Sequence, residues 1–276
     1  MFRKSILYTK PFLISLLLLS TAYADDAKWK LKESNDYFTF FNEDSDYTQG
    51  LEVSRSTESS TIAFGQDIYT PLHKKINPPN PEERPYAGYM YLNFEFNEPL
   101  DNENKFFYGI QPGWVGPGAR GKQAQCTVHS LLDQHCPKGW PSQLHNEPAL
   151  TLRAGILNTQ YLDMGFLSGE QNTKLLLEAG NVRSKLHLDT QIKWEGLGLY
   201  YFAGPGVDLI ARNIFLDGNT WQESPSVDKK ILVSELKGGV GYKYHNYGVM
   251  WFIAVKSPEF EQQHGSYNYG GIELSW

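Results

Sequence analysis

The sequence predicts an all-β fold, a twelve-stranded antiparallel transmembrane β-barrel with long outer loops. The final segment places Ile272, Leu274 and Trp276 on one face of a strand and polar residues on the other. A strand that ends in an aromatic residue is typical of barrels in the Gram-negative outer membrane. Aromatic residues make up 14% of the chain while the mean hydropathy is negative, as expected when only the outward half of each strand is apolar. A soluble β-sandwich is the alternative.

The N-terminal segment predicts export. Basic residues precede the apolar run 12–19, and Ala22 and Ala24 supply small residues at the spacing of a cleavage site. The run is too short for a spanning helix, which needs about 20 residues. We therefore expect residues 1–24 to be a signal peptide and residues 25–276 to form one barrel domain.

Charge and cysteine content narrow the classes of function. The net charge is −6, and it becomes −9 when the three basic residues of the signal peptide are removed. An acidic exported protein is a poor candidate for a nucleic-acid partner. Nine residues separate Cys126 from Cys136. An oxidising periplasm allows them to form a disulfide, with two free thiols as the alternative.

Alternating segments separated by turn residues run through the whole mature chain. About 250 residues at roughly 20 per strand suggest ten to twelve strands, too few for a wide porin. In the third segment, for example, Ile62, Phe64 and Ile68 alternate with Ala63 and Asp67. The first four of the twelve predicted strands contain the alternating segments 28–32, 50–54, 62–69 and 89–96. The later ones lie at about 105–115, 149–169, 173–181, 185–195, 197–211, 229–243, 248–257 and 265–276.

The even strand number places both chain ends in the periplasm. The first strand ends near residue 37, and the links 57–60 and 98–104 are then short inner turns. The longer connections become outer loops, at 38–46, 70–85, 116–148 and 212–228. Long loops outside and short turns inside are the expected asymmetry of such barrels.

Four polar clusters fall at the predicted outer rim: Asn35-Asp36, Asp46 to Gly50, Lys74-Lys75 with Arg84, and His129. If the strands are regular, Asp36 shares the inward face with the lysines of its strand, and Thr48 shares it with Gly50 and Glu52. The two would then lie close together inside the barrel mouth. Each cluster also has a simpler interpretation, since Asn and Asp are common turn residues and loop lysines are often merely solvated.

These residue types suit ester hydrolysis. A neutral histidine such as His129 can take a proton from water near neutral pH. A carboxylate such as Asp36 can hold a hard cation like Ca²⁺, which would polarise an ester carbonyl and stabilise an oxyanion. The sequence contains no Gly-x-Ser-x-Gly elbow and no zinc-type spacing of histidine and cysteine.

Several segments in one order resemble the outer-membrane lipid A 3′-O-deacylases, along most of the mature chain. The segments are Asn35-Asp36, Asp46 to Gly50, Gly65 to Pro71, Arg84 to Gly88, Gly116-Pro117, Gln125 to His129, Trp140, Gln143 to Pro148, Ala211 to Asn219 and Ser257 to Phe260. The resemblance implies a Ca²⁺-dependent esterase that releases the 3′-acyloxyacyl chain of lipid A. Its substrate would be lipopolysaccharide in the outer leaflet, and its active site would lie at the extracellular side.

Carried over by position, the resemblance makes His129 the general base. Asn35, Asp36 and Thr48 would form the rest of the active site, with Asp36 nearest the metal. Either of two lysines, Lys74 or Lys75, would face phosphate or sugar oxygens of lipid A, and we also assign Arg84 to substrate binding.

The chain departs from the family pattern at one position. The acidic residue that follows the family's histidine falls at or near His135 here. Asp133 is the nearest carboxylate and Glu147 is another candidate, so the partner of His129 is left open between them.

Two other functions fit the same features. One is a non-enzymatic barrel, either a small channel or a lipopolysaccharide-binding protein, and a wide aqueous lumen would favour the channel. The other is a phospholipase that acts on glycerophospholipids. In each case we expect a monomer among outer-membrane lipids.

Overall fold

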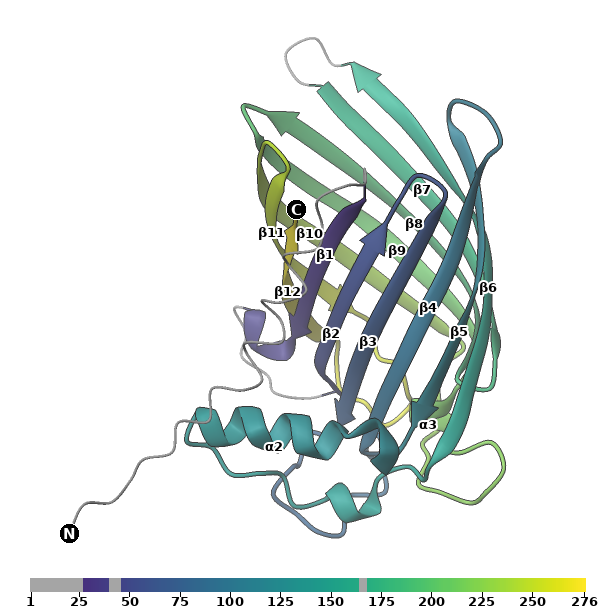
Figure 1. Cartoon of the computed structure of the whole chain (residues 1–276). Coiled ribbons are helices and arrows are strands. Elements are labelled where there is room, and N and C mark those ends of the chain that lie inside the picture. Colours follow the sequence, from purple (N-terminus) through teal and green to yellow (C-terminus); the bar gives the residue numbers. More distant parts are fainter. Residues whose placement is uncertain (1–26, 40–45, 164–167) are drawn as a thin grey trace, which may run out of the picture.

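The computed structural model describes residues 27–39, 46–163 and 168–276. Within these ranges twelve antiparallel strands form a closed barrel, in which each strand pairs with its sequence neighbours and β1 pairs with β12 (Figure 1). The predicted fold class is thereby confirmed. The strands are β1 (Lys28–Asn35), β2 (Asp46–Ser56), β3 (Ser60–Thr70), β4 (Ala87–Pro99), β5 (Asn104–Val115), β6 (Glu147–Asp163), β7 (Ser168–Gly180), β8 (Arg183–Gly196), β9 (Leu199–Asn213), β10 (Leu232–Tyr244), β11 (Tyr247–Lys256) and β12 (Tyr267–Ser275).

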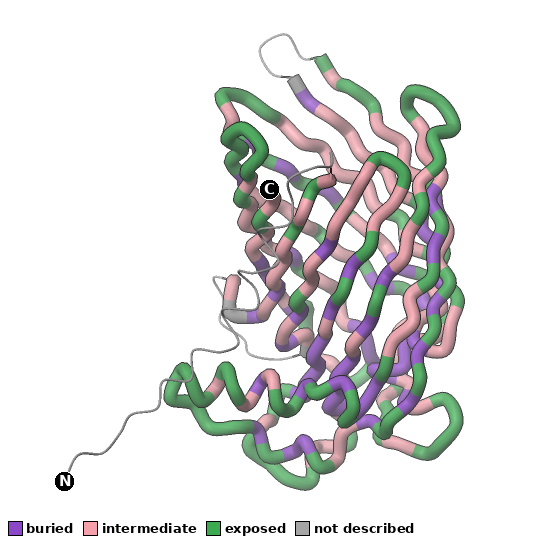
Figure 2. Tube along the Cα trace, viewed as in Figure 1, coloured by how far each residue is buried: buried purple, intermediate pink, exposed green. Residues whose placement is uncertain are grey.

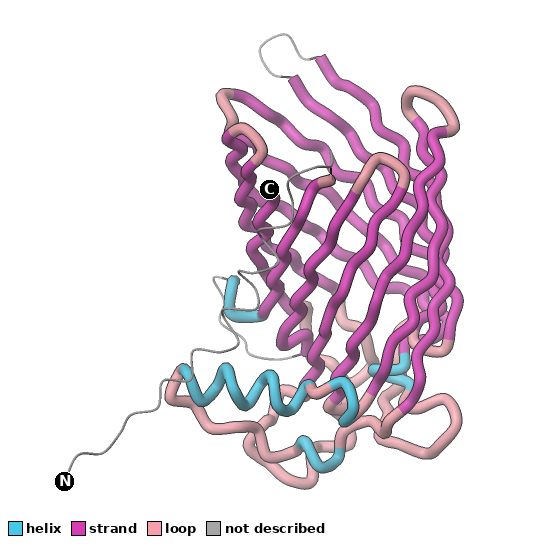
Figure 3. Tube along the Cα trace, viewed as in Figure 1, coloured by secondary structure: helices cyan, strands magenta, loops and turns pink. Residues whose placement is uncertain are grey.

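The long connections gather at one end of the barrel, here called the loop end, and short turns link the strands at the other (Figure 3). The helices lie at the loop end: η1 (Asp36–Phe38), η2 (Pro117–Ala119), α2 (Gly121–Leu131), η3 (Trp140–Ser142) and α3 (Ile214–Asp217). The C-terminus lies toward the opposite end (Figure 1), where Trp276 and Trp29 exchange backbone hydrogen bonds. Among the described residues, no helix is both long and apolar enough to cross a bilayer.

Some strand boundaries differ from the prediction. The first strand ends at Asn35, two residues early, because the chain turns into η1. The predicted strand 149–169 covers parts of two strands, since β6 already ends at Asp163 and β7 begins at Ser168. Lys229 belongs to an isolated bridge with Phe260 and not to β10. The predicted signal peptide lies outside the described residues and stays a prediction.

Side chains alternate between the two faces of the barrel wall, as a period of two requires. Ile62 and Phe64 are about half exposed on the outward face of β3, whereas Asp67 lines an internal cavity. Exposed and buried residues accordingly alternate along many strands (Figure 2). In a bilayer, the outward apolar residues would contact lipid tails.

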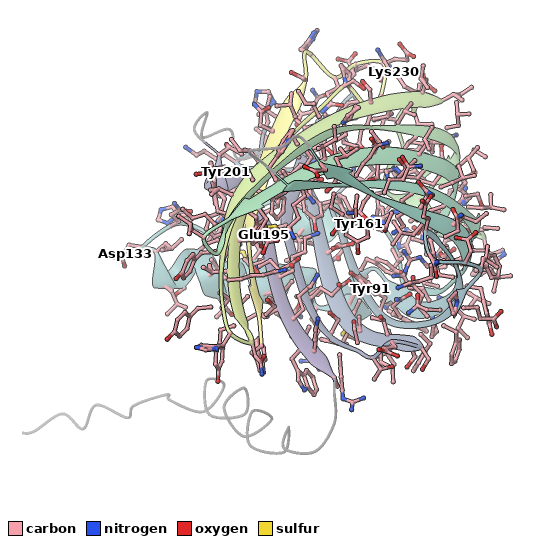
Figure 4. All side chains as sticks on the ribbon, turned by 90° about the horizontal axis from the view of Figure 1, so that it is seen from above. Tyr91, Asp133, Tyr161, Glu195, Tyr201 and Lys230 are labelled. Carbon is pink, nitrogen blue, oxygen red and sulfur yellow. A yellow bond between two sulfur atoms is a disulfide. The ribbon has the colours of Figure 1, made fainter. Side chains whose placement is uncertain are left out.

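Side chains occupy the interior midway along the barrel and at the loop end. Midway along the barrel, the Arg153 guanidinium lies 3.3 Å from carboxylate oxygens of both Glu95 and Glu178. At the loop end, the ring of Phe215 in α3 stacks on Tyr69 with 4.2 Å between centroids. Viewed along the barrel axis, side chains project into the interior from around the wall (Figure 4).

Candidate active site

Helix α2 packs on the outer surface of the barrel. Ile68 follows Ile62 and Phe64 on the outward face of β3, yet it is fully buried against Tyr86 and Trp140. Two residues earlier on the same face, Gln66 Nε2 donates a hydrogen bond to the carbonyl of Ala119, just before α2, at 2.6 Å. The helix therefore covers wall positions that would otherwise face lipid.

His129 lies on the face of α2 that is turned toward the wall. Gly121, Gln125 and His129 are four residues apart, so they share one stripe of the helix. Gly121 packs against Gly88 of β4, and Gln125 is buried and accepts a hydrogen bond from Trp140 Nε1 at 2.8 Å. His129 is half-buried, and it lies about 12 Å along the helix from Gly121.

A backbone carbonyl orients the imidazole of His129. Nδ1 lies 2.8 Å from the carbonyl oxygen of His135, and because a carbonyl can only accept, Nδ1 carries the proton. Nε2 is then the nitrogen with a free electron pair, as a general base requires. The family pattern has an acidic residue at or near His135. In this protein the main-chain carbonyl of His135 binds the imidazole instead.

The two carboxylates considered as partners of His129 occupy other places. Asp133 is exposed at the far tip of the α2 region, outside the barrel ring (Figure 4). Glu147 is buried and accepts hydrogen bonds from Asn181, Asn219 and the backbone of Thr220, so it ties the loops of other strands together.

Cys126 and Cys136 form the disulfide that the sequence left open, with their Cα atoms 4.7 Å apart. The bond joins the middle of α2 to the segment that follows it. Both His129 and His135 therefore lie within the covalent ring.

Thr48 faces outward, so the prediction of an inward Thr48 is wrong. The register of β2 against β3 shifts between Tyr47 and Gln49, which marks a β-bulge at Thr48. The extra residue reverses the alternation of side chains between the inward and outward faces of the strand. Thr48 Oγ1 consequently lies 2.5 Å from Oγ1 of Thr70, on the same face as Ile68.

Asn35 and Asp36 lie where β1 ends and η1 begins, so strand alternation does not reach Asp36 as predicted. Instead η1 folds over the outward face of β12, because a Cβ on Gly270 would lie 2.7 Å from the carbonyl oxygen of Phe38. Asp36 is 1% exposed there. Asp36 and Thr48 therefore do not meet inside the barrel mouth. Both lie at the outer surface of the rim.

The outward face near the rim is polar in β1 and β2. Asn35 is paired in register with Gln49, and Gln49 hydrogen-bonds to the half-buried Glu33. Such residues are expensive next to lipid tails. Sequence reasoning assigned no role to Glu33 or Gln66, and it placed Gln49 in a rim cluster without giving it a role. Gln66 was visible as a polar residue on the outward face of a predicted strand.

The three predicted substrate-binding cations separate into two places. The carbonyl of Lys74 accepts hydrogen bonds from Lys138, beyond α2, and from Tyr86, on the outer wall. Lys74 is half-buried, whereas Lys75 is exposed. Arg84 is 1% exposed and pairs with Glu259 at 2.6 Å. Its guanidinium also lies over the inward-facing Tyr69. Arg84 therefore belongs to the interior of the barrel and not to the outer surface beside α2.

Comparison with known proteins identifies the family. A family model described as outer membrane protein LpxR matches residues 12–276. The chain belongs to the LpxR family. This is the lipid A 3′-O-deacylase family that the sequence motifs resemble, and its members are proteins of the outer membrane.

A solved LpxR structure agrees with this assignment at the level of the fold. LpxR from Salmonella typhimurium is 20% identical and has a TM-score of 0.79, with 90% of this chain and 99% of that chain covered. The translocator domain of autotransporter NalP from Neisseria meningitidis is 10% identical with a TM-score of 0.40, covering 96% and 93%. The CymD monoaromatic hydrocarbon channel is 7% identical with a TM-score of 0.40, covering 90% and 86%. No curated protein matches the chain in sequence.

The oxygen groups of the predicted site residues fit a hard cation better than a soft one. Asp36 contributes a carboxylate, Asn35 an amide oxygen and Thr48 a hydroxyl, all at the loop end of neighbouring strands. Over the described ranges, no three His, Cys, Asp or Glu side chains gather as a metal cluster. A cation bound here would therefore draw on amide, hydroxyl or main-chain oxygens beside one carboxylate.

Proposed function

We propose that this member of the LpxR family is a Ca²⁺-dependent esterase that removes the 3′-acyloxyacyl chain of lipid A at the extracellular side of the outer membrane. The observation that carries the proposal is the placement of His129. Its imidazole is held in one tautomer on a helix that packs against the outside of the barrel wall. Lipid lies outside the barrel, whereas a solute passing through a channel would lie inside.

The chemistry would proceed by attack of water on the ester carbonyl. Nε2 of His129 removes one proton from the water, and the oxygen forms the new bond to the acyl carbon. The carbonyl of His135 holds the imidazolium that results. His129 then returns the proton to the departing sugar oxygen, which leaves a free fatty acid and a 3′-hydroxyl group.

The remaining residues would position the ester. Asp36 and the amide oxygen of Asn35 would hold Ca²⁺, whose charge when bound would polarise the ester carbonyl and stabilise the oxyanion. The hydroxyl of Thr48 is fixed by Thr70 at the same rim and can donate or accept a hydrogen bond there. Lys74 would face phosphate or sugar oxygens from the loop beside α2.

Mass spectrometry of lipid A from a host that expresses the full chain tests this function. We expect loss of the 3′-acyloxyacyl group with Ca²⁺ present, its retention with His129→Ala, and a weaker response to Ca²⁺ with Asp36→Ala. His264→Ala is a matched control, because this histidine is exposed in a loop at the same end of the barrel. An intact 3′ group would overturn the proposal, and fatty acid released only from glycerophospholipid would favour a phospholipase.

A further inference from the structure

The segment after α2 holds the hydrogen-bond partner of His129 but has little packing of its own. Residues 131–136 are all exposed. The amide of Gln134 donates to the carbonyl of His129 at 2.7 Å, which turns the chain back toward the helix. A backbone carbonyl in an exposed loop is a poor orienting group unless something else fixes that loop, because exposed loops move on fast timescales.

The disulfide supplies that constraint. Cys126 lies three residues before His129, and Cys136 directly follows His135. A disulfide keeps the two Cα atoms within a narrow range of separation. The bond therefore holds Cys136 close to Cys126 in α2. The carbonyl of His135, which accepts the hydrogen bond from His129 Nδ1, directly precedes Cys136 and is held with it.

We infer that the disulfide between Cys126 and Cys136 is a positioning device for the general base, which takes over the orienting task that a carboxylate performs in the family pattern. This inference rests on the proposed function. The ring places a main-chain acceptor at His135 and needs no charged partner. In this inference the disulfide acts only through His129.

A kinetic double-mutant cycle tests the inference on the full chain in detergent micelles with lipid A and Ca²⁺. We expect Cys126→Ser with Cys136→Ser to lower kcat between about 10-fold and 100-fold, the range that a small misplacement of a catalytic group produces. KM should change by less than about twofold, because binding is separate from proton transfer. In the His129→Ala background, removing the disulfide should leave the residual rate unchanged.

Two results would overturn the inference. One is an equal loss of rate in both backgrounds, which means that the disulfide only stabilises the loop. The other is an unchanged kcat without the disulfide. Asp133→Asn is the matched control, since it alters the nearest carboxylate and keeps the ring intact. It should leave the rate as it is. Failure of the wild-type chain to release any fatty acid would instead count against the proposed function.

A second measurement does not depend on activity. In protein labelled with ¹⁵N-histidine, the two ring nitrogens report the tautomer of each of the seven histidines, and His129→Ala assigns the signal. We expect an Nδ1-protonated imidazole for His129 in the wild type and a mixture of tautomers in the double serine variant. The same tautomer in both proteins would overturn the inference, whatever the catalytic rates.

Discussion

Gly88 of β4 and Gly121 of α2 touch backbone to backbone. A Cβ on Gly88 would lie 2.9 Å from the nitrogen of Gly121, and a Cβ on Gly121 would lie 2.9 Å from the Cα of Gly88. Both contacts are closer than real Cβ atoms allow. The close approach lets the start of α2 lie flat on the outer wall. It thereby sets the positions of Gln125 and His129, which lie further along the same face of the helix.

Enlarging Gly88 should move the helix without unfolding the barrel. Gly88→Ala forces the start of α2 outward by a few tenths of an ångström, and we expect deacylation to fall about 10-fold because the base is displaced. The rate of fatty-acid release measures this effect. Gly196→Ala is the control, since a Cβ there meets nothing within 4 Å. Equal activity of the two variants would show that helix placement does not limit the reaction.

The two loop lysines should differ in their effect on substrate binding. Lys74 is half-buried in a segment tied to the region beyond α2, while Lys75 is exposed to solvent. We expect Lys74→Ala to raise KM for lipid A several-fold, on the order of the 1 kcal/mol that a partly exposed ionic contact supplies. Lys75→Ala should change little. Repeating the assay with dephosphorylated lipid A separates phosphate from sugar contacts, and a larger effect of Lys75→Ala would reverse the assignment.

Phe215 lies inside the barrel mouth, on the other side of the wall from α2. Its ring is 1% exposed and stacks on Tyr69 in the mouth. Phe215→Ala should destabilise the barrel by about 3–5 kcal/mol, as large core truncations do, and the unfolding midpoint in urea measures this loss. Below that midpoint, lipid A hydrolysis should persist, because α2 lies on the other side of the wall. Lost activity in a folded variant would instead indicate a site inside the mouth.

The ion pair between Arg84 and Glu259 should matter for stability. Glu259 also accepts hydrogen bonds from Lys256 at 2.8 Å and from the hydroxyl of Tyr267 at 3.1 Å, and its side chain is 6% exposed. Glu259→Gln would leave two cations with a neutral acceptor, and we expect a loss on the order of 3 kcal/mol. An unchanged unfolding midpoint in urea would mean that water hydrates Arg84 and Lys256 once the carboxylate is removed.

The same carboxylate gives a pH dependence of defined sign. Burial by itself would raise the pKa of Glu259, but the charges of Lys256 and Arg84 lower it from 4.5 to about 2. A depressed pKa in the folded state stabilises the protein above pH 4.5, and this stabilisation is lost as the pH falls toward 2. Unfolding temperatures of the wild type and Glu259→Gln should therefore converge as the pH falls from about 4.5 toward 2. A constant difference would contradict the assigned cause.

The barrel itself could be predicted from the sequence because its signals are local. Alternation with a period of two, as at Ile62 and Phe64, depends only on neighbouring residues, and the strand number then fixes which connections share an end. The errors arose where local rules are interrupted. The predicted strand 149–169 was continued past the end of β6 at Asp163, and the first strand was extended beyond Asn35.

The candidate site shows the limit of the same rules. Residue types and family motifs selected His129, Asp36 and Thr48 from the sequence alone, and their roles stay predictions. The side of the wall that Thr48 faces depends on a single inserted residue, because the bulge at Thr48 reverses the alternation that parity assumes. Nothing local in the sequence separates a regular strand from a bulged one at that point.

Sequence by itself therefore determined the barrel, the end at which its loops gather and the residue types available for chemistry. Tertiary structure decided that α2 lies outside the wall, that Arg84 belongs to the interior with Glu259, and that His129 is oriented by the carbonyl of His135. The physical reason is that these contacts join residues distant in the chain, or use main-chain atoms that every residue carries. No side-chain pattern encodes which carbonyl a ring nitrogen will meet.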